Sequence, residues 1–126
     1  MPIKRMIAVL LMLSFIAIPV VAQEQRISHV VFCWLKEPGN PEHRQQVIEQ
    51  SKRLTEIPGV LEIRAGEMVP SKRKIVDSTF DVAIYMTFAN QQAMDSYIVH
   101  PFHKEIVKEK LKPLVSKILV YDFIEK

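Results

Sequence analysis

Hydrophobic residues follow the period of a strand in four segments of the chain and the period of a helix in the segments between them. Alternating, β-branched and aromatic residues predict strands over residues 27–35, 60–69, 80–88 and 118–124. Apolar residues at helical spacing predict one helix over 41–56 and a second helical stretch that is capped by Asn90 and restarts at Pro101. The order β-α-β-β-α-β predicts an α+β, ferredoxin-like fold, with one four-stranded antiparallel sheet and its helices on one face.

Proline and glycine mark the boundaries of these elements. Pro41 suits the first turn of the first helix, and the run 57–59 (Ile-Pro-Gly) ends that helix. Gly66 predicts a bulge or bend in the second strand. Pro113 predicts a kink late in the last helix.

Both faces of the predicted sheet carry apolar side chains. In the first strand Val31 and Cys33 share one face with His29, and Phe32 and Trp34 lie on the other. The third strand has one strongly apolar face, made by Phe80, Val82, Ile84, Met86 and Phe88. It also places Ala83 and Tyr85 on its second face. Because the helices can cover only one face, we expect a second copy of the chain to cover the other, as a homodimer.

The first 22 residues have the layout of a secretory signal peptide. Lys4 and Arg5 precede an uncharged apolar run over 6–18, and Val20-Val21-Ala22 supplies small or modest side chains before a cleavage point. The apolar run is short for an uncleaved membrane anchor, which is the alternative. We therefore expect cleavage after Ala22, export to the periplasm or the exterior, a mature domain over 23–126, and no stable membrane association.

Removal of this segment changes the charge of the protein. The whole chain carries a net charge of +3, whereas cleavage leaves 15 basic residues against 14 acidic ones, a net charge of +1. One short basic cluster, Lys72-Arg73-Lys74, lies in a predicted loop. Such a distribution does not indicate a nucleic-acid-binding protein, which needs a clustered basic face. The single cysteine, Cys33, cannot form an internal disulfide, and its apolar strand predicts burial.

An ordered set of short motifs over residues 27–124 resembles the stress-responsive A/B barrel (Dabb) family. The motifs are His29-Val30-Val31-Phe32, Ile57-Pro58-Gly59-Val60, Phe80-Asp81-Val82-Ala83, Thr87-Phe88, Tyr97-Ile98-Val99-His100-Pro101-Phe102-His103 and Val120-Tyr121-Asp122-Phe123. The resemblance implies a homodimer whose two sheets close into a barrel, a dimeric α/β barrel. It also implies a pocket on the helix-facing side of the sheet.

The same resemblance implies candidate site residues. A plant member of the family is a polyketide cyclase that uses a Tyr–His pair as acid and base, and the matching positions here are Tyr97 and His103. His29 matches the histidine on the cyclase's first strand. A further histidine of the cyclase matches Val82 here, so the polar pocket of the cyclase is not fully reproduced. Imidazole titrates near neutral pH, so a histidine beside a tyrosine hydroxyl can move a proton at a carbon next to a carbonyl.

Structural roles for the same residues stay open. The helical spacing of Tyr97 also suits a core residue whose hydroxyl contacts water. His103 is placed to cap backbone groups at a helix start. His100 is expected to serve the turn before Pro101, and His43 to lie exposed on the first helix. No acidic or cysteine residue lies close enough in sequence to complete a metal site with His100 and His103, so we expect none.

The sequence therefore predicts an exported, stress-associated homodimer that binds a small apolar or aromatic molecule in a pocket lined by His29, Tyr97 and His103. No cofactor is expected, because Trp34 and Tyr85 are interpreted as interface packing rather than as a flavin or haem platform. The main alternative is a polyketide-cyclase-like enzyme with Tyr97 and His103 as its catalytic pair. A minor alternative is monooxygenase-like oxidation of an aromatic compound, since distantly similar monooxygenases share the barrel.

Overall fold

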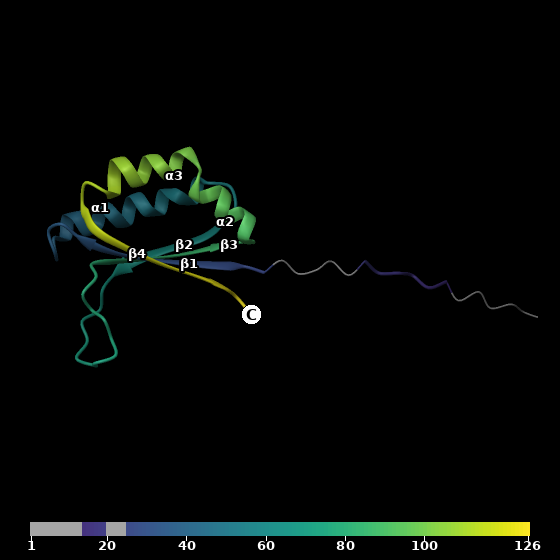
Figure 1. The fold of residues 1–126 in the computed structure, drawn as a ribbon, viewed down its shortest axis with the longest axis horizontal. Helices are drawn as coiled ribbons and strands as arrows, with labels where there is room; N and C mark the ends of the chain where they lie inside the picture. The colour runs from purple at the N-terminus through teal and green to yellow at the C-terminus, as the bar shows by residue number, and fades with distance from the viewer. Residues whose placement is uncertain (1–13, 20–24) are drawn as a thin grey trace, which may run out of the picture.

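The computed structural model describes residues 14–19 and 25–126, so most of the predicted signal peptide (residues 1–13 and 20–22) lies outside the described residues. The remaining chain forms one layer of strands and one layer of helices (Figure 1). In chain order the elements are β1 (Ile27–Leu35), α1 (Pro41–Lys52), the 3₁₀ turn η1 (Arg53–Glu56), β2 (Val60–Glu67), β3 (Val82–Phe88), α2 (Gln91–Ile98), α3 (Pro101–Glu105), the π-helical segment η2 (Ile106–Leu111) and β4 (Val115–Ile124).

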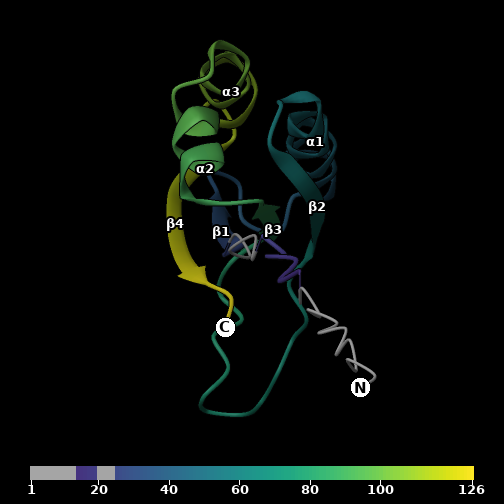
Figure 2. The same ribbon diagram turned by 90° about the vertical axis from the view of Figure 1, so that its right-hand side faces the viewer.

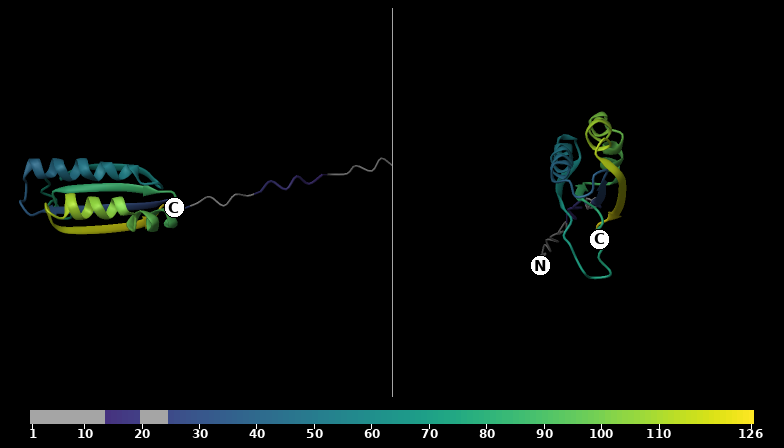
Figure 3. Two further views of the ribbon diagram at one scale, coloured as in Figure 1. Left: turned by 90° about the horizontal axis from the view of Figure 1, so that it is seen from above. Right: turned by 90° about the vertical axis from the view of Figure 1, so that its left-hand side faces the viewer.

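The sheet has the order β2-β3-β1-β4, and all neighbouring strands are antiparallel. All the helices lie on one face of this sheet, with α1 beside the α2–α3 arm (Figures 2 and 3). This arrangement confirms the predicted ferredoxin-like fold. No helix in the described part of the chain has the length and hydropathy that a membrane span requires.

Local sequence signals explain how the helices begin. The Asn40 side chain accepts a hydrogen bond from the backbone N–H of His43 at 3.0 Å, and Pro41 occupies the first helical position. Asn90 caps α2 in the same way, through the N–H of Ala93 at 2.8 Å. Gly59 has φ +93°, and a Cβ there would lie 3.0 Å from the Cβ of Ala93. Glycine therefore lets the turn after η1 pack closely against α2.

Two predicted irregularities occur elsewhere in the chain. Gly66 pairs regularly with Ala83, and the register shift in β2 lies between Val60 and Glu62, so the bulge predicted at Gly66 was wrong in position. The helix ends at Leu111, before Pro113, so Pro113 does not kink it. The distortion comes from η2, at whose end the N–H of Lys112 donates to the carbonyl of Val107, five residues back, at 2.9 Å.

Phe80 lies on the opposite face of the sheet from the one predicted. Its ring packs against Phe32, with ring centroids 5.0 Å apart, on the face without helices. The buried Asp81 explains the difference, because its carboxylate accepts the backbone N–H groups of Leu35 at 2.9 Å and Gly39 at 2.8 Å. These contacts fix the end of the loop between β2 and β3. Side chains alternate regularly between the two faces of the sheet only after this loop, within β3.

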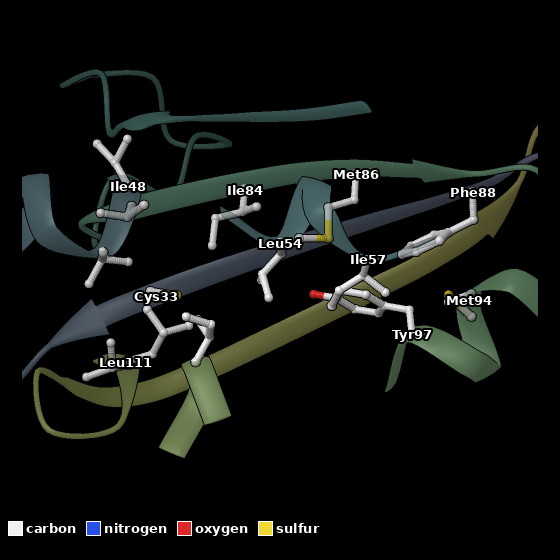
Figure 4. Packing of buried hydrophobic residues seen from close by; sticks show 14 of the residues in the cluster. Cys33, Ile48, Leu54, Ile57, Ile84, Met86, Phe88, Met94, Tyr97 and Leu111 are labelled. Atoms are coloured by element: carbon white, nitrogen blue, oxygen red, sulfur yellow. The ribbon is translucent and has the colours of Figure 1, made fainter. Parts of the chain in front are cut away.

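The two faces of β1 confirm the predicted alternation. On the helix side Cys33 and Leu35 belong to the hydrophobic core, part of which Figure 4 draws. On the other face Phe32 and Trp34 are only half-buried, and the β4 residues Tyr121 and Phe123 are 58% and 52% exposed. The loop between β2 and β3 also projects from this open side (Figures 1 and 2). The sheet therefore has a closed face toward the helices and an open apolar face.

Candidate functional site

A cavity of about 330 Å³ lies between the sheet and the helices. Its wall is mainly apolar, and its residues come from β1, β3, β4, α1, η1, α2, α3 and η2. These lining residues are His29, Val31, Cys33, Ser51, Leu54, Ile84, Met86, Tyr97, Ile98, His103, Val107, Leu111, Ile118, Val120 and Asp122. The cavity therefore contains all three predicted site residues.

His29 is oriented by Asp122 on the neighbouring strand. The register of β1 and β4 places these residues directly opposite each other, and Nδ1 of His29 lies 2.5 Å from Oδ1 of Asp122. The imidazole is buried, whereas the carboxylate is 40% exposed at the edge of the sheet. A carboxylate accepts hydrogen bonds, so Nδ1 of His29 carries a proton and donates it to Asp122.

His103 is oriented by the backbone at the end of α2. Its Nδ1 lies 3.0 Å from the carbonyl oxygen of Ile98, which can only accept, so Nδ1 donates and Nε2 is the acceptor. Burial lowers the pKa of His103 below its usual value of 6.5. The hydrogen bond to Ile98 raises the pKa, and the nearby His29 and His100 lower it further. His103 is thus held as a neutral base at physiological pH.

Tyr97 brings a hydroxyl group to the two imidazoles. Its side chain is almost fully buried, and its ring centroid lies 4.4 Å from that of His103 and 6.0 Å from that of His29. The hydroxyl points away from Met94 and toward Leu54 (Figure 4). Burial raises the pKa of Tyr97 far above its usual range, so the phenol stays protonated. It makes no hydrogen bond to another residue within 14–19 or 25–126.

These three side chains combine a proton donor, Tyr97, with a neutral acceptor, His103, and a second imidazole, His29. A ligand oxygen beside Tyr97 can accept its hydroxyl hydrogen, and a ligand hydroxyl or an acidic C–H can face an imidazole Nε2. No group of three His, Cys, Asp or Glu side chains within the described ranges could hold a metal ion. Tyr97 and the two imidazoles can supply hydrogen bonding and proton transfer.

Asp122 belongs to this cluster, although no individual role was predicted for it. Two signals point to it: alternation along the last strand puts it on the face of Ile118 and Val120, and antiparallel pairing brings that strand beside His29. Alternation alone leaves the register open, so the pairing with His29 needs the structure.

The other histidines have structural positions. His100 caps α3, since its Nδ1 accepts the backbone N–H of Phe102 at 3.1 Å, in agreement with its predicted role in the turn. His43 was predicted to be exposed, but its side chain is only 24% exposed and its Nδ1 lies 3.1 Å from a carboxylate oxygen of Glu37. Residues 72–74, the predicted basic cluster, are exposed in the loop.

Cys33 is buried at the cavity wall, as predicted. Burial in apolar surroundings raises the pKa of its thiol to about 11, so the thiol stays neutral. Cys33 therefore contributes packing to the cavity rather than a nucleophile.

The lowered pKa of His103 predicts a pH dependence of stability. In the unfolded chain this ring titrates near 6.5, so below that pH the unfolded state takes up a proton that the folded state resists. The His103 contribution to stability is therefore complete above about pH 6.5 and declines as the pH falls toward the folded-state pKa. Melting temperatures at pH 7.5 and 5.5 should fall less on acidification in His103→Gln than in wild type. His43→Gln is the control, and an unchanged acid slope in His103→Gln would contradict the assignment.

Comparisons with known proteins agree with this architecture. The family model described as "Stress responsive A/B Barrel Domain" matches residues 27–125. Among curated proteins, the chain is similar to a stress-response A/B barrel domain-containing protein of Arabidopsis thaliana, 26% identical over 102 residues. This match covers 81% of the chain but only 38% of that relative, so the chain spans well under half of its length.

Solved structures repeat the fold. A Dabb family protein with a ferredoxin-like fold from Mesorhizobium loti is 25% identical, with a TM-score of 0.66 over 82% of this chain and 99% of its own. A hydroxynitrile lyase from Passiflora edulis is 24% identical, with a TM-score of 0.70 over 83% and 96% of the two chains. A dimeric ferredoxin-like protein from Thermobifida fusca is 18% identical, with a TM-score of 0.65 over 84% and 96%. The chain is thus a member of the stress-responsive A/B barrel (Dabb) domain family.

Proposed function

We propose that the protein binds a small, mainly apolar molecule in the cavity between sheet and helices, with a hydroxyl or carbonyl group of that molecule held by His29, Tyr97 and His103. The observation that carries this proposal is the combination of an apolar cavity of about 330 Å³ with three oriented polar groups on its wall. A ligand that buries about 200 Å² of apolar surface there would gain roughly 5 kcal/mol before association costs are subtracted.

The polar groups narrow the chemistry of the ligand. The Tyr97 hydroxyl donates a hydrogen bond, while Nε2 of His29 and of His103 accepts one whenever it is unprotonated. A phenol or an enol meets both demands with one oxygen, because its O–H can donate to an imidazole while its lone pairs accept from Tyr97. A carboxylate has no hydrogen to donate to the imidazoles, so a neutral head group fits better.

A second candidate function, acid–base catalysis, is favoured by the same geometry. A ligand carbonyl that accepts from Tyr97 would place its neighbouring C–H near the imidazoles, where Nε2 of the neutral His103 could take the proton. The C–H bond would break, its electron pair would form the C=C bond of an enolate, and the Tyr97 hydroxyl would stabilise the negative charge on the enolate oxygen by its hydrogen bond. The lyase among the fold neighbours indicates that this fold can carry an enzyme. The candidate activity here rests on the residues of this chain.

Replacement of Tyr97 separates the two functions. Tyr97→Phe keeps the ring and removes the donor, so binding of 4-propylphenol, measured by calorimetry, should weaken about 3–10-fold, the value of one neutral hydrogen bond. For an enzyme, deuterium exchange at the carbons next to the carbonyl of 4-phenyl-2-butanone, followed by NMR in D₂O, should fall roughly 100-fold or more in Tyr97→Phe and in His103→Gln.

Tyr121→Phe is the matched control, because Tyr121 is exposed on the open face of the sheet. It should leave both measurements unchanged. Binding without any exchange in the wild type would support a binding protein. Absence of both binding and exchange would contradict the proposed function.

We further propose that the functional unit is a homodimer joined through the open faces of two sheets. That face carries a depression of about 300 Å³ lined by Phe32, Trp34, Asp77, Phe80, Leu119 and Tyr121. Sheet-on-sheet packing around a two-fold axis would cover these side chains in both copies. The dimeric protein from Thermobifida fusca, which has the same fold, supports this assembly.

A charge on this face should prevent assembly. Trp34→Asp would bury an unpaired carboxylate at the centre of the contact, so light scattering should give a monomer or aggregates where wild type gives a dimer. Val99→Asp is the matched control, because Val99 is 62% exposed at the end of α2, on the helix side. A wild-type protein that stays monomeric at micromolar concentration would rule out the homodimer.

A further inference from the structure

Ser51 is a buried hydroxyl in the cavity wall that the cluster of Tyr97 and the two imidazoles does not use. It lies near the end of α1, between Ile48 of α1 and Leu54 of η1, it has no exposed surface, and it lines the cavity. Its Oγ has no hydrogen-bond partner within the described part of the chain.

A serine at this position needs an explanation. Within a helix a serine hydroxyl usually bonds a carbonyl one turn back or points to solvent, and that of Ser51, near the end of α1, does neither. Alanine would fill almost the same space without a buried polar atom, and buried polar atoms in proteins normally have partners. A partner that enters with a ligand accounts for the hydroxyl.

The position of Ser51 defines a second polar point along the cavity. In Figure 4 the Tyr97 hydroxyl points toward Leu54, while Ile48 and Cys33 lie farther from Tyr97. Ser51 precedes Leu54 by about one helical turn, or roughly 4.5 Å, in the direction of Ile48. Along β1 the wall extends from His29 to Cys33, about 13 Å at the rise of a strand.

We infer that the Ser51 hydroxyl binds a second neutral oxygen of the ligand, farther along the cavity than the head group, so that the cavity selects molecules with two oxygens. This inference rests on the proposed binding function. The ionisable groups that orient the head, His29, His103 and Asp122, lie on β1, α3 and β4, whereas Ser51 lies on α1. Apart from these groups, Tyr97 and Ser51 itself, the lining is apolar or carries the neutral thiol of Cys33, which favours a hydroxyl, ether or carbonyl over a charged group.

A pair of phenols that differ in one oxygen tests the inference. Wild type should bind 4-(3-hydroxypropyl)phenol about 3–10-fold more tightly than 4-propylphenol, measured by calorimetry at pH 7.5. Ser51→Ala should remove this preference while it binds 4-propylphenol at least as well as wild type. Ser96→Ala, the same change at an exposed position of α2, is the matched control and should keep the preference.

Thermal melting of the free proteins supplies a second readout. Ser51→Ala should melt at the wild-type temperature or above, because the hydroxyl that it removes has no partner. Equal affinity of wild type for the two phenols, a preference retained in Ser51→Ala, or a clear fall in its melting temperature would each overturn the inference. Failure of wild type to bind either phenol would instead overturn the proposed binding function itself, and this inference with it.

Discussion

The register of β1 between its two neighbours is the constraint on which the rest of the structure depends. β1 lies in the middle of the sheet, paired with β3 on one side and β4 on the other, and its side chains alternate between the two faces. If β4 slipped by one residue against β1, His29 would lose its position opposite Asp122. The apolar side chains of β4 would also move to the opposite faces of the sheet. The register of β1 therefore positions both the cavity and the proposed dimer contact, since His29 faces the helices and Phe32 faces away from them.

The apolar wall of the cavity determines the state of the polar groups within it. Burial keeps Tyr97 protonated and His103 neutral, because each would lose hydration on becoming charged. Each imidazole also has its Nδ1 occupied, by Asp122 for His29 and by the Ile98 carbonyl for His103. Desolvation and these two hydrogen bonds together produce a site in which Tyr97 donates and His103 accepts, suited to a neutral oxygen.

Alternation and helical periodicity were sufficient to predict the element order and the two faces of β1, because both depend on local spacing. The contact between His29 and Asp122 joins residues 93 positions apart, and its register cannot be derived from local spacing. Phe80 was placed on the wrong face because the hydrogen bonds that the Asp81 carboxylate accepts from distant backbone leave no local signal. The resemblance to the Dabb family supplied the candidate site, whereas the missing partner of Ser51 became visible only in three dimensions.

The central claim is that Nδ1 of both imidazoles donates a hydrogen bond, and that burial leaves Nε2 of His103 unprotonated beside a protonated Tyr97. Nitrogen-15 NMR of histidine-labelled protein at pH 7.5 tests it directly, because protonated and unprotonated ring nitrogens have well-separated chemical shifts. The account predicts that His29 and His103 are both protonated at Nδ1, that Nε2 of His103 is unprotonated, and that 4-propylphenol shifts the Nε2 signal of His103. An unprotonated Nδ1 in either ring would contradict the hydrogen bonds from which the proposed function is derived.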